Sequence, residues 1–166
     1  MKCNKFFFTI FFVAIYTFAY SQNNASIKPV FNAYLGLKDA LVASNNEQAI
    51  TNANNLVKAL AGVNTNDLNS STNNVWVKLG TDLKTNSTSI ASSNDISLQR
   101  IFFVSLSNNM YTLIKAAKFD APVYYQFCPM ANKGKGANWL SLENKVKNPY
   151  YGSMMLSCGK VVETLE

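Results

Sequence analysis

The sequence contains no histidine, and Arg100 is its single arginine among 166 residues. Without histidine the chain cannot form a Ser-His-Asp triad or the zinc sites that depend on imidazole ligands. The lysines are spread along the chain and arginine does not accompany them, which is a poor pattern for binding nucleic acid. We therefore expect no histidine-based catalysis and no nucleic-acid partner.

Long apolar runs are also absent: crossing a bilayer takes about 20 apolar residues, and the longest run here, residues 6–19, is shorter and contains two threonines. It follows Lys2 and Lys5 and leads to small residues at Ala19 and Ser21, the order of a secretory signal peptide and its cleavage site. We therefore expect export to the periplasm and no retained membrane anchor. The predicted organisation is a signal peptide over residues 1–21, a polar leader over 22–26 and a single domain over 27–166.

Apolar residues recur at helical spacing along four stretches, which polar turns rich in Asn and Ser separate. Four amphipathic segments joined by short turns predict an all-α fold, an antiparallel up-down-up-down four-helix bundle. Gly62 is expected to end the second helix in a left-handed conformation. The four stretches are residues 27–42, 49–63, 75–92 and 98–114. Their expected N-caps, in the same order, are Ser26, a residue among 44–46, one of Ser70, Ser71 and Thr72, and a residue among 93–95.

The helical pattern ends near Pro122, and the rest of the chain is rich in sulfur. Residues 123–127 are β-branched, aromatic or Gln, which predicts a short extended piece within an otherwise irregular segment. Residues 123–160 hold two cysteines and three methionines, and form the candidate functional region. These are Cys128, Met130, Met154, Met155 and Cys158.

Cysteine is scarce, because Cys3 lies in the predicted signal peptide and only Cys128 and Cys158 remain in the mature chain. In an oxidising compartment an even pair is first a disulfide candidate, and closing a loop of about 30 residues contributes roughly 3–4 kcal/mol in the chain-entropy model. The alternative is a soft-metal site, since thiolates and thioethers select Cu(I) and need neither His nor carboxylate. Both interpretations stay open on the residues alone. A thiol-based oxidoreductase acting through Cys128 is a third, but a close-spaced Cys-x-x-Cys is missing, so we do not expect an enzyme.

Six stretches of the chain form recognisable motifs: the helical stretches 34–42 and 99–107, CPMA (128–131), GANWLS (136–141), NPYYG (148–152) and MLSCG (155–159). Taken in this order, they resemble the motifs of domain-of-unknown-function family 3347. The resemblance covers about residues 27–164 and departs from the usual pattern at Tyr151, where phenylalanine is expected. Members of this family occur as small exported bacterial proteins and attached to the adaptor subunits of copper and silver efflux pumps.

The resemblance implies heavy-metal handling, and favours the metal site over the disulfide. The expected function is binding of Cu(I) or Ag(I) in the cell envelope, to buffer the metal or deliver it, with an efflux adaptor as the implied partner. The alternative is a structural or interaction module that a Cys128–Cys158 disulfide closes and that docks on an envelope protein. The expected metal ligands are Cys128, Cys158, Met130 and Met155, with Met154 in reserve.

Overall fold

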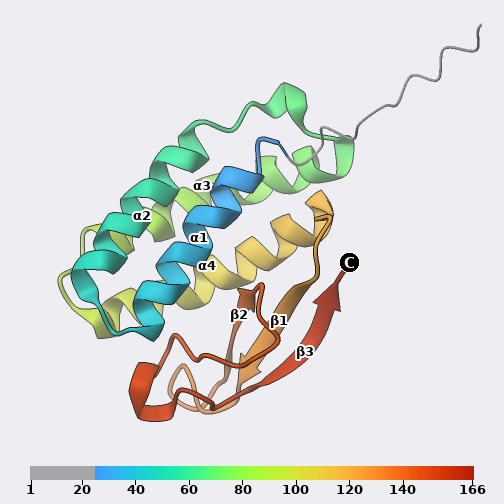
Figure 1. Ribbon diagram of the computed structural model, residues 1–166. Coiled ribbons are helices and arrows are strands. Elements are labelled where there is room, and N and C mark those ends of the chain that lie inside the picture. The colour runs from blue at the N-terminus through green and yellow to red at the C-terminus, as the bar shows by residue number, and fades with distance from the viewer. Residues whose placement is uncertain (1–24) are drawn as a thin grey trace, which may run out of the picture.

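The computed structural model describes residues 25–166, and it places four helices before a small sheet (Figure 1). The predicted signal peptide and most of the polar leader lie outside the described residues. Along the part that is described, no helix is long and apolar enough to cross a membrane. The elements are α1 (Lys28–Val42), α2 (Asn46–Ala61), the 3₁₀ turn η1 (Thr65–Asp67), α3 (Ser70–Ala91), α4 (Ile96–Ala117), β1 (Val123–Cys128), β2 (Ala137–Ser141), the 3₁₀ turn η2 (Gly152–Met155) and β3 (Lys160–Leu165).

Short polar side chains begin three of the four helices. The carboxamides of Asn45 and Asn69 accept hydrogen bonds from backbone N–H groups at 3.0 and 2.8 Å, and Asp95 does the same at 2.7 Å. The predicted caps before α2 and α4 are therefore confirmed. For α3 the cap is Asn69, one residue before the predicted candidates, so this helix begins at Ser70 and not at Val75.

Two predicted helix ends were wrong. Ser26 does not cap α1; its hydroxyl instead donates to Asp67 Oδ2 at 3.1 Å, and Ile27 occupies the N-cap without a side-chain bond. Proline in the first turn of α1 removes one of the N–H groups that a cap would otherwise satisfy. Gly62 does end α2, but with a φ of −87°, so its freedom to adopt a left-handed conformation is not used.

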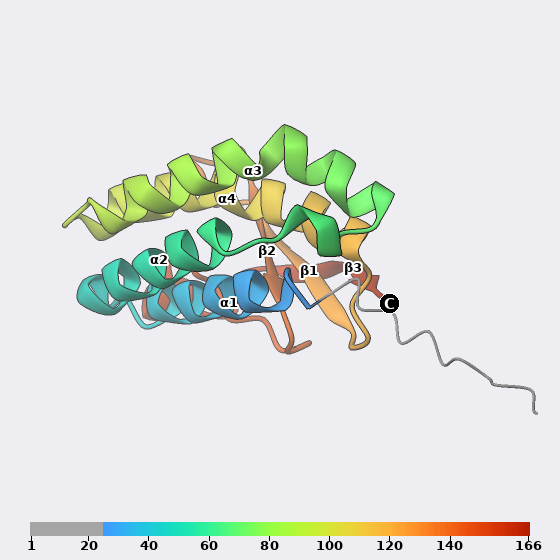
Figure 2. The ribbon, with the colours of Figure 1, turned by 90° about the horizontal axis from the view of Figure 1, so that it is seen from above.

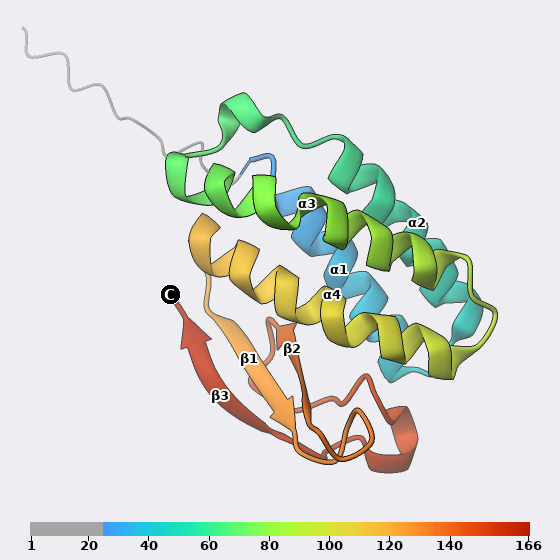
Figure 3. The same cartoon turned by 180° about the vertical axis from the view of Figure 1, so that it is seen from behind.

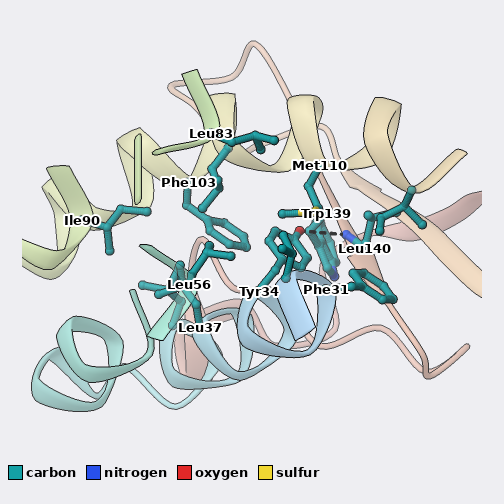
Figure 4. Packing of buried hydrophobic residues seen from close by; sticks show 14 of the residues in the cluster. Phe31, Tyr34, Leu37, Leu56, Leu83, Ile90, Phe103, Met110, Trp139 and Leu140 are labelled. Atoms are coloured by element: carbon teal, nitrogen blue, oxygen red, sulfur yellow. Dashed lines mark hydrogen bonds between the residues drawn. The ribbon is translucent and has the colours of Figure 1, made fainter. Parts of the chain in front are cut away.

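The helices pack in chain order, each on the one before it, and run in alternating directions. Seen from above, α1 and α2 lie side by side, and so do α3 and α4 (Figure 2). Their apolar faces meet in one core, where each large side chain contributes roughly 1.5–3 kcal/mol on burial. Figure 4 shows this core, to which the helices contribute Phe31, Tyr34, Leu37, Leu56, Leu83, Ile90, Phe103 and Met110 among others.

The predicted all-α class is wrong, because about the last quarter of the chain contains a three-stranded antiparallel sheet of order β2-β1-β3. The protein is therefore α+β. Gln126 of β1 pairs with Trp139 of β2, and Tyr125 pairs with Glu163 of β3. The sequence showed β1 as an extended piece, but antiparallel pairing with two later strands satisfies its backbone groups and converts an apparently irregular segment into a sheet.

Strand β2 fastens the sheet to the helices, and lies against α4 when the molecule is seen from behind (Figure 3). Its Trp139 and Leu140 are fully buried. The hydroxyl of Tyr34 in α1 accepts a hydrogen bond from the Leu140 N–H at 3.1 Å, the dashed line in Figure 4, and lies 2.8 Å from Ser107 Oγ. Helices and sheet thus share one core, with a polar link inside it.

Arg100 fixes the long segment between β2 and β3 to the helices. Its Nε donates to the Pro149 carbonyl at 2.8 Å, while its Nη2 donates to the Leu41 carbonyl at 3.0 Å and to Ser44 Oγ at 2.9 Å. One guanidinium therefore joins the start of α4, the end of α1 and the turn before η2. This anchoring holds in place the segment that carries Met154, Met155 and Cys158.

Candidate metal centre

The structure brings the two cysteines of the described chain together. Cys128 is the last residue of the central strand β1 and is fully buried. Cys158 lies just before β3 and is partly exposed. Their sulfurs are 2.8 Å apart, with both cysteines as free thiols.

Glycine at position 159 allows Cys158 to approach β1 this closely. Gly159 has a φ of +143°, a conformation that residues with a Cβ rarely adopt. A Cβ at this position would lie 2.8 Å from the Phe127 carbonyl oxygen and 3.0 Å from the Trp139 ring. The backbone beside Cys158 therefore packs directly on the strand that carries Cys128.

Asn148 holds Cys158 from the other side. It is fully buried, and its Nδ2 donates to the Cys158 carbonyl at 2.8 Å. Its Oδ1 accepts from the N–H groups of Tyr150 and Tyr151 at 2.8 and 3.3 Å, and its own N–H donates to the Leu156 carbonyl at 2.8 Å. One side chain thus shapes the turn before η2 and fixes the backbone at the second cysteine.

The separation of the sulfurs is informative about the chemistry available to them. A disulfide bond is about 2.05 Å long, so the thiols need to approach by less than 1 Å to form one. Two thiolates at about 2.3 Å from one metal ion in tetrahedral geometry lie about 3.8 Å apart, and further apart in a trigonal or linear site. The pair is therefore closer to disulfide geometry than to metal-bound geometry, and metal binding requires it to open by about 1 Å.

Among the three candidate methionine ligands, Met130 shares a surface hollow with Cys158. The hollow is lined by Phe127, Pro129, Met130, Cys158, Gly159 and Lys160. Met130 is 53% exposed, and its carbonyl accepts a hydrogen bond from the Tyr151 hydroxyl at 2.7 Å. A thioether is therefore available at the open side of the thiol pair.

Met154 and Met155 lie in η2, outside the lining of this hollow. Met154 is 74% exposed. The Met155 carbonyl accepts the Cys158 N–H at 3.0 Å, so the backbone of Met155, like that of Gly159, helps to place the cysteine. The structure gives Met130 a clearer place beside the thiol pair than it gives either methionine of η2.

The surroundings of Cys158 do not activate its thiol. The hydrogen bond with Cys128, partial burial and the neighbouring thiol together raise the pKa of Cys158 above its usual range. A thiol in this state is mostly protonated near neutral pH, so a bound metal ion has to displace its proton.

Within residues 25–166, no three side chains of the Cys, Asp, Glu or His type converge to form a site for a metal ion. The described chain therefore does not present a four-ligand zinc site or a carboxylate site for a hard cation. What it does present is two thiols and a nearby thioether. This set of donors suits soft monovalent ions.

Sequence reasoning did not identify Asn148 and Gly159 as the residues that position Cys158. The Asn-Pro pair at 148–149 indicates a turn, because Asn side chains bond to backbone groups a few residues further on. Its bond to the Cys158 carbonyl spans ten positions, and nothing local in the sequence indicates it.

Fold and site together define a small α+β protein, a helical layer joined to a three-stranded sheet that presents a dithiol at one end. The chain matches the family described as Protein of unknown function (DUF3347) over residues 30–121, more than half of its length, and it belongs to that family. The matched range covers the helices, apart from the first two residues of α1, and ends before β1. The candidate metal ligands therefore all lie beyond it. No curated protein and no solved structure matches the chain.

Proposed function

We propose that this protein binds Cu(I) or Ag(I) through sulfur in the cell envelope, and buffers the ion or delivers it to an efflux partner. The observation that carries the proposal is the meeting of Cys128, Cys158 and Met130: two thiols in contact, with a thioether in the hollow that reaches one of them. Soft donors without carboxylate or imidazole select soft monovalent ions.

In this proposal the metal enters from the hollow. Cys128 is buried in the central strand, whereas Cys158 lies in an irregular segment and is partly exposed, so the required opening of about 1 Å occurs at Cys158. Met130 then completes a two-thiolate, one-thioether site. Met155 is the next candidate for the thioether, and Met154 stands in reserve.

The proposal includes export by the predicted signal peptide, residence in the periplasm, and no catalysis. The metal ion is the cargo, and an envelope efflux adaptor is the implied protein partner. No nucleic acid and no retained membrane anchor have a part in it.

The test is an anaerobic titration of the reduced protein with Cu(I) in competition with a chelator of known affinity. We expect the wild-type protein to take copper from the chelator and the Cys128→Ser/Cys158→Ser double variant to fail to do so. Every variant carries Cys3→Ser so that the third thiol of the sequence does not contribute. Equal binding by the wild-type protein and the double variant would contradict the proposal.

A specific observation favours a second function, a structural module closed by a Cys128–Cys158 disulfide. The sulfurs lie 2.8 Å apart, which is nearer to bonding distance than to the spacing of two thiolates on one metal ion. Mass spectrometry of protein taken directly from the envelope separates the two functions. If all of the protein has a mass lower by two hydrogens, because Cys128 and Cys158 form a disulfide, the result favours the module. Free thiols or a metal adduct favour the metal site.

A further inference from the structure

The two sulfurs of the pair differ in how they meet the solvent. Cys128 is 0% exposed and lies at the end of a strand that is paired on both sides. Cys158 is partly exposed and lines the hollow together with Met130 and Lys160. A reagent from solution therefore reaches Cys158 first, because the buried Cys128 is not accessible to it.

The hollow and the turns around it carry positive charge. Lys160 lines the hollow, and Lys133 and Lys135 lie in the exposed turn that follows Met130. The two segments that meet here, residues 128–136 and 151–160, contain no Asp or Glu. An anionic reagent is therefore attracted to the neighbourhood of Cys158, and a cationic one is repelled.

We propose that Cys158 and Cys128 carry out thiol–disulfide exchange with small, carboxylate-bearing disulfides, Cys158 as the attacking thiol and Cys128 as the resolving thiol. The resulting protein disulfide closes the site to metal. The exchange rests on the geometry of the pair alone, and the closure rests on the proposed function.

The exchange balances in two steps. The Cys158 sulfur, as thiolate, attacks one sulfur of the small disulfide; a mixed disulfide forms, the disulfide bond of the reagent breaks, and one small thiol leaves with a proton. The Cys128 sulfur, 2.8 Å away, then attacks Cys158 Sγ and expels the second small thiol. The small disulfide is reduced by two electrons and the protein dithiol is oxidised by two.

Closure follows because the same two sulfurs serve both states. As a disulfide they have no thiolate to offer, and only the thioether of Met130 remains in the hollow. The reduced pair holds the soft ion and the oxidised pair releases it. Exchange with the thiol pool of the compartment would then set the metal-binding capacity of the protein.

The exchange is tested with glutathione disulfide as the anionic probe and cystamine as the cationic one, on full-length proteins that carry Cys3→Ser. Mass spectrometry of the otherwise wild-type protein should show loss of two hydrogens and little mixed disulfide. Cys128→Ser should accumulate one glutathione adduct on Cys158. Cys158→Ser should react at least about tenfold more slowly than Cys128→Ser, because its remaining thiol is buried.

Three results would overturn the exchange. One is equal reactivity of Cys158→Ser and Cys128→Ser, and another is a mixed disulfide that persists when both cysteines are present. The third needs no cysteine variant: brief treatment of the protein with a small alkylating agent should label Cys158 before Cys128, and the reverse order contradicts the proposal. For the charge preference, Lys160→Glu should lower the ratio of glutathione disulfide to cystamine rates at low salt, and an unchanged ratio contradicts it.

Closure is tested with Ag(I), which does not oxidise thiols, by equilibrium dialysis of the reduced and the disulfide forms. We expect the disulfide form to bind at least about tenfold more weakly. Equal binding by both forms overturns the closure and leaves the metal site standing. Failure of the reduced form to bind Ag(I) overturns the proposed function, while the exchange is judged by the mass spectra alone.

Discussion

Replacing Asn148 with alanine should destabilise the protein more than its single amide side chain suggests. The substitution removes one donor and one acceptor, and so leaves three backbone groups without their partner: the Cys158 carbonyl and the N–H groups of Tyr150 and Tyr151. A buried polar group left without a partner costs about 1–3 kcal/mol, and these groups are buried or partly buried. We expect a loss of about 3–5 kcal/mol in the free energy of unfolding.

The measurement is urea unfolding followed by tryptophan fluorescence, with the thiols kept reduced so that no disulfide contributes. With a slope of about 2 kcal/mol per molar urea, the loss corresponds to a midpoint lower by about 2 M. Such a variant still folds if the parent has the stability of about 5–15 kcal/mol that is usual for a domain.

Asn138→Ala is the matched control. Asn138 is a partly exposed asparagine of β2 whose side chain makes one long hydrogen bond, 3.3 Å to the Gln126 carbonyl. Its loss should cost about 1 kcal/mol or less. If the two variants are destabilised by the same amount, Asn148 does not hold the segment around Cys158 in the way its hydrogen bonds indicate.

Three further predictions follow from other parts of the molecule. In the same unfolding assay, Gly152→Ala should lower the free energy of unfolding by about 2 kcal/mol more than Gly134→Ala. Both glycines have positive φ, but a Cβ at 152 would lie 2.9 Å from Arg100 Nη2, whereas a Cβ at 134 would have no atom within 4 Å. Burial raises the pKa of Tyr34 above that of unfolded tyrosine, so its contribution to stability is complete below about pH 10 and is lost progressively above it. Tyr34→Phe should therefore flatten the fall in the free energy of unfolding above about pH 10, and an unchanged slope would contradict this. Met130→Leu removes the thioether and should weaken Ag(I) binding about three- to tenfold in competition titrations. The unfolding midpoint should stay nearly unchanged, because this side chain is 53% exposed. An unaltered affinity would show that Met130 is not a ligand.

The helices could be predicted because their information is local. The apolar spacing and the polar caps lie within each stretch, and the structure places four helices there. The cap of α3 was missed by one residue, because Asn69 stands beside Ser70, Ser71 and Thr72, all of which can serve as caps.

The sheet could not be predicted because its information is not local. β3 is a six-residue strand whose partner β1 ends more than thirty positions earlier, and its alternating exposed and partly exposed residues resemble an ordinary surface segment. The same limit applies to the site. That Cys128 and Cys158 form a pair was expected from their number, but the roles of Asn148 and Gly159 depend on contacts that only the fold creates.

The family match and the proposed function concern different parts of the chain. Membership rests on residues 30–121, the helical part, whereas the candidate metal ligands lie in the C-terminal sheet region. Evidence for metal binding therefore has to come from the sulfur residues themselves.

X-ray absorption at the copper edge tests the central claim most directly, on reduced protein loaded anaerobically with Cu(I). Our proposal predicts a first shell made only of sulfur, two or three atoms at about 2.3 Å, and the loss of this signal in the Cys128→Ser/Cys158→Ser double variant. A first shell of nitrogen or oxygen, or the same spectrum from the double variant, would contradict it.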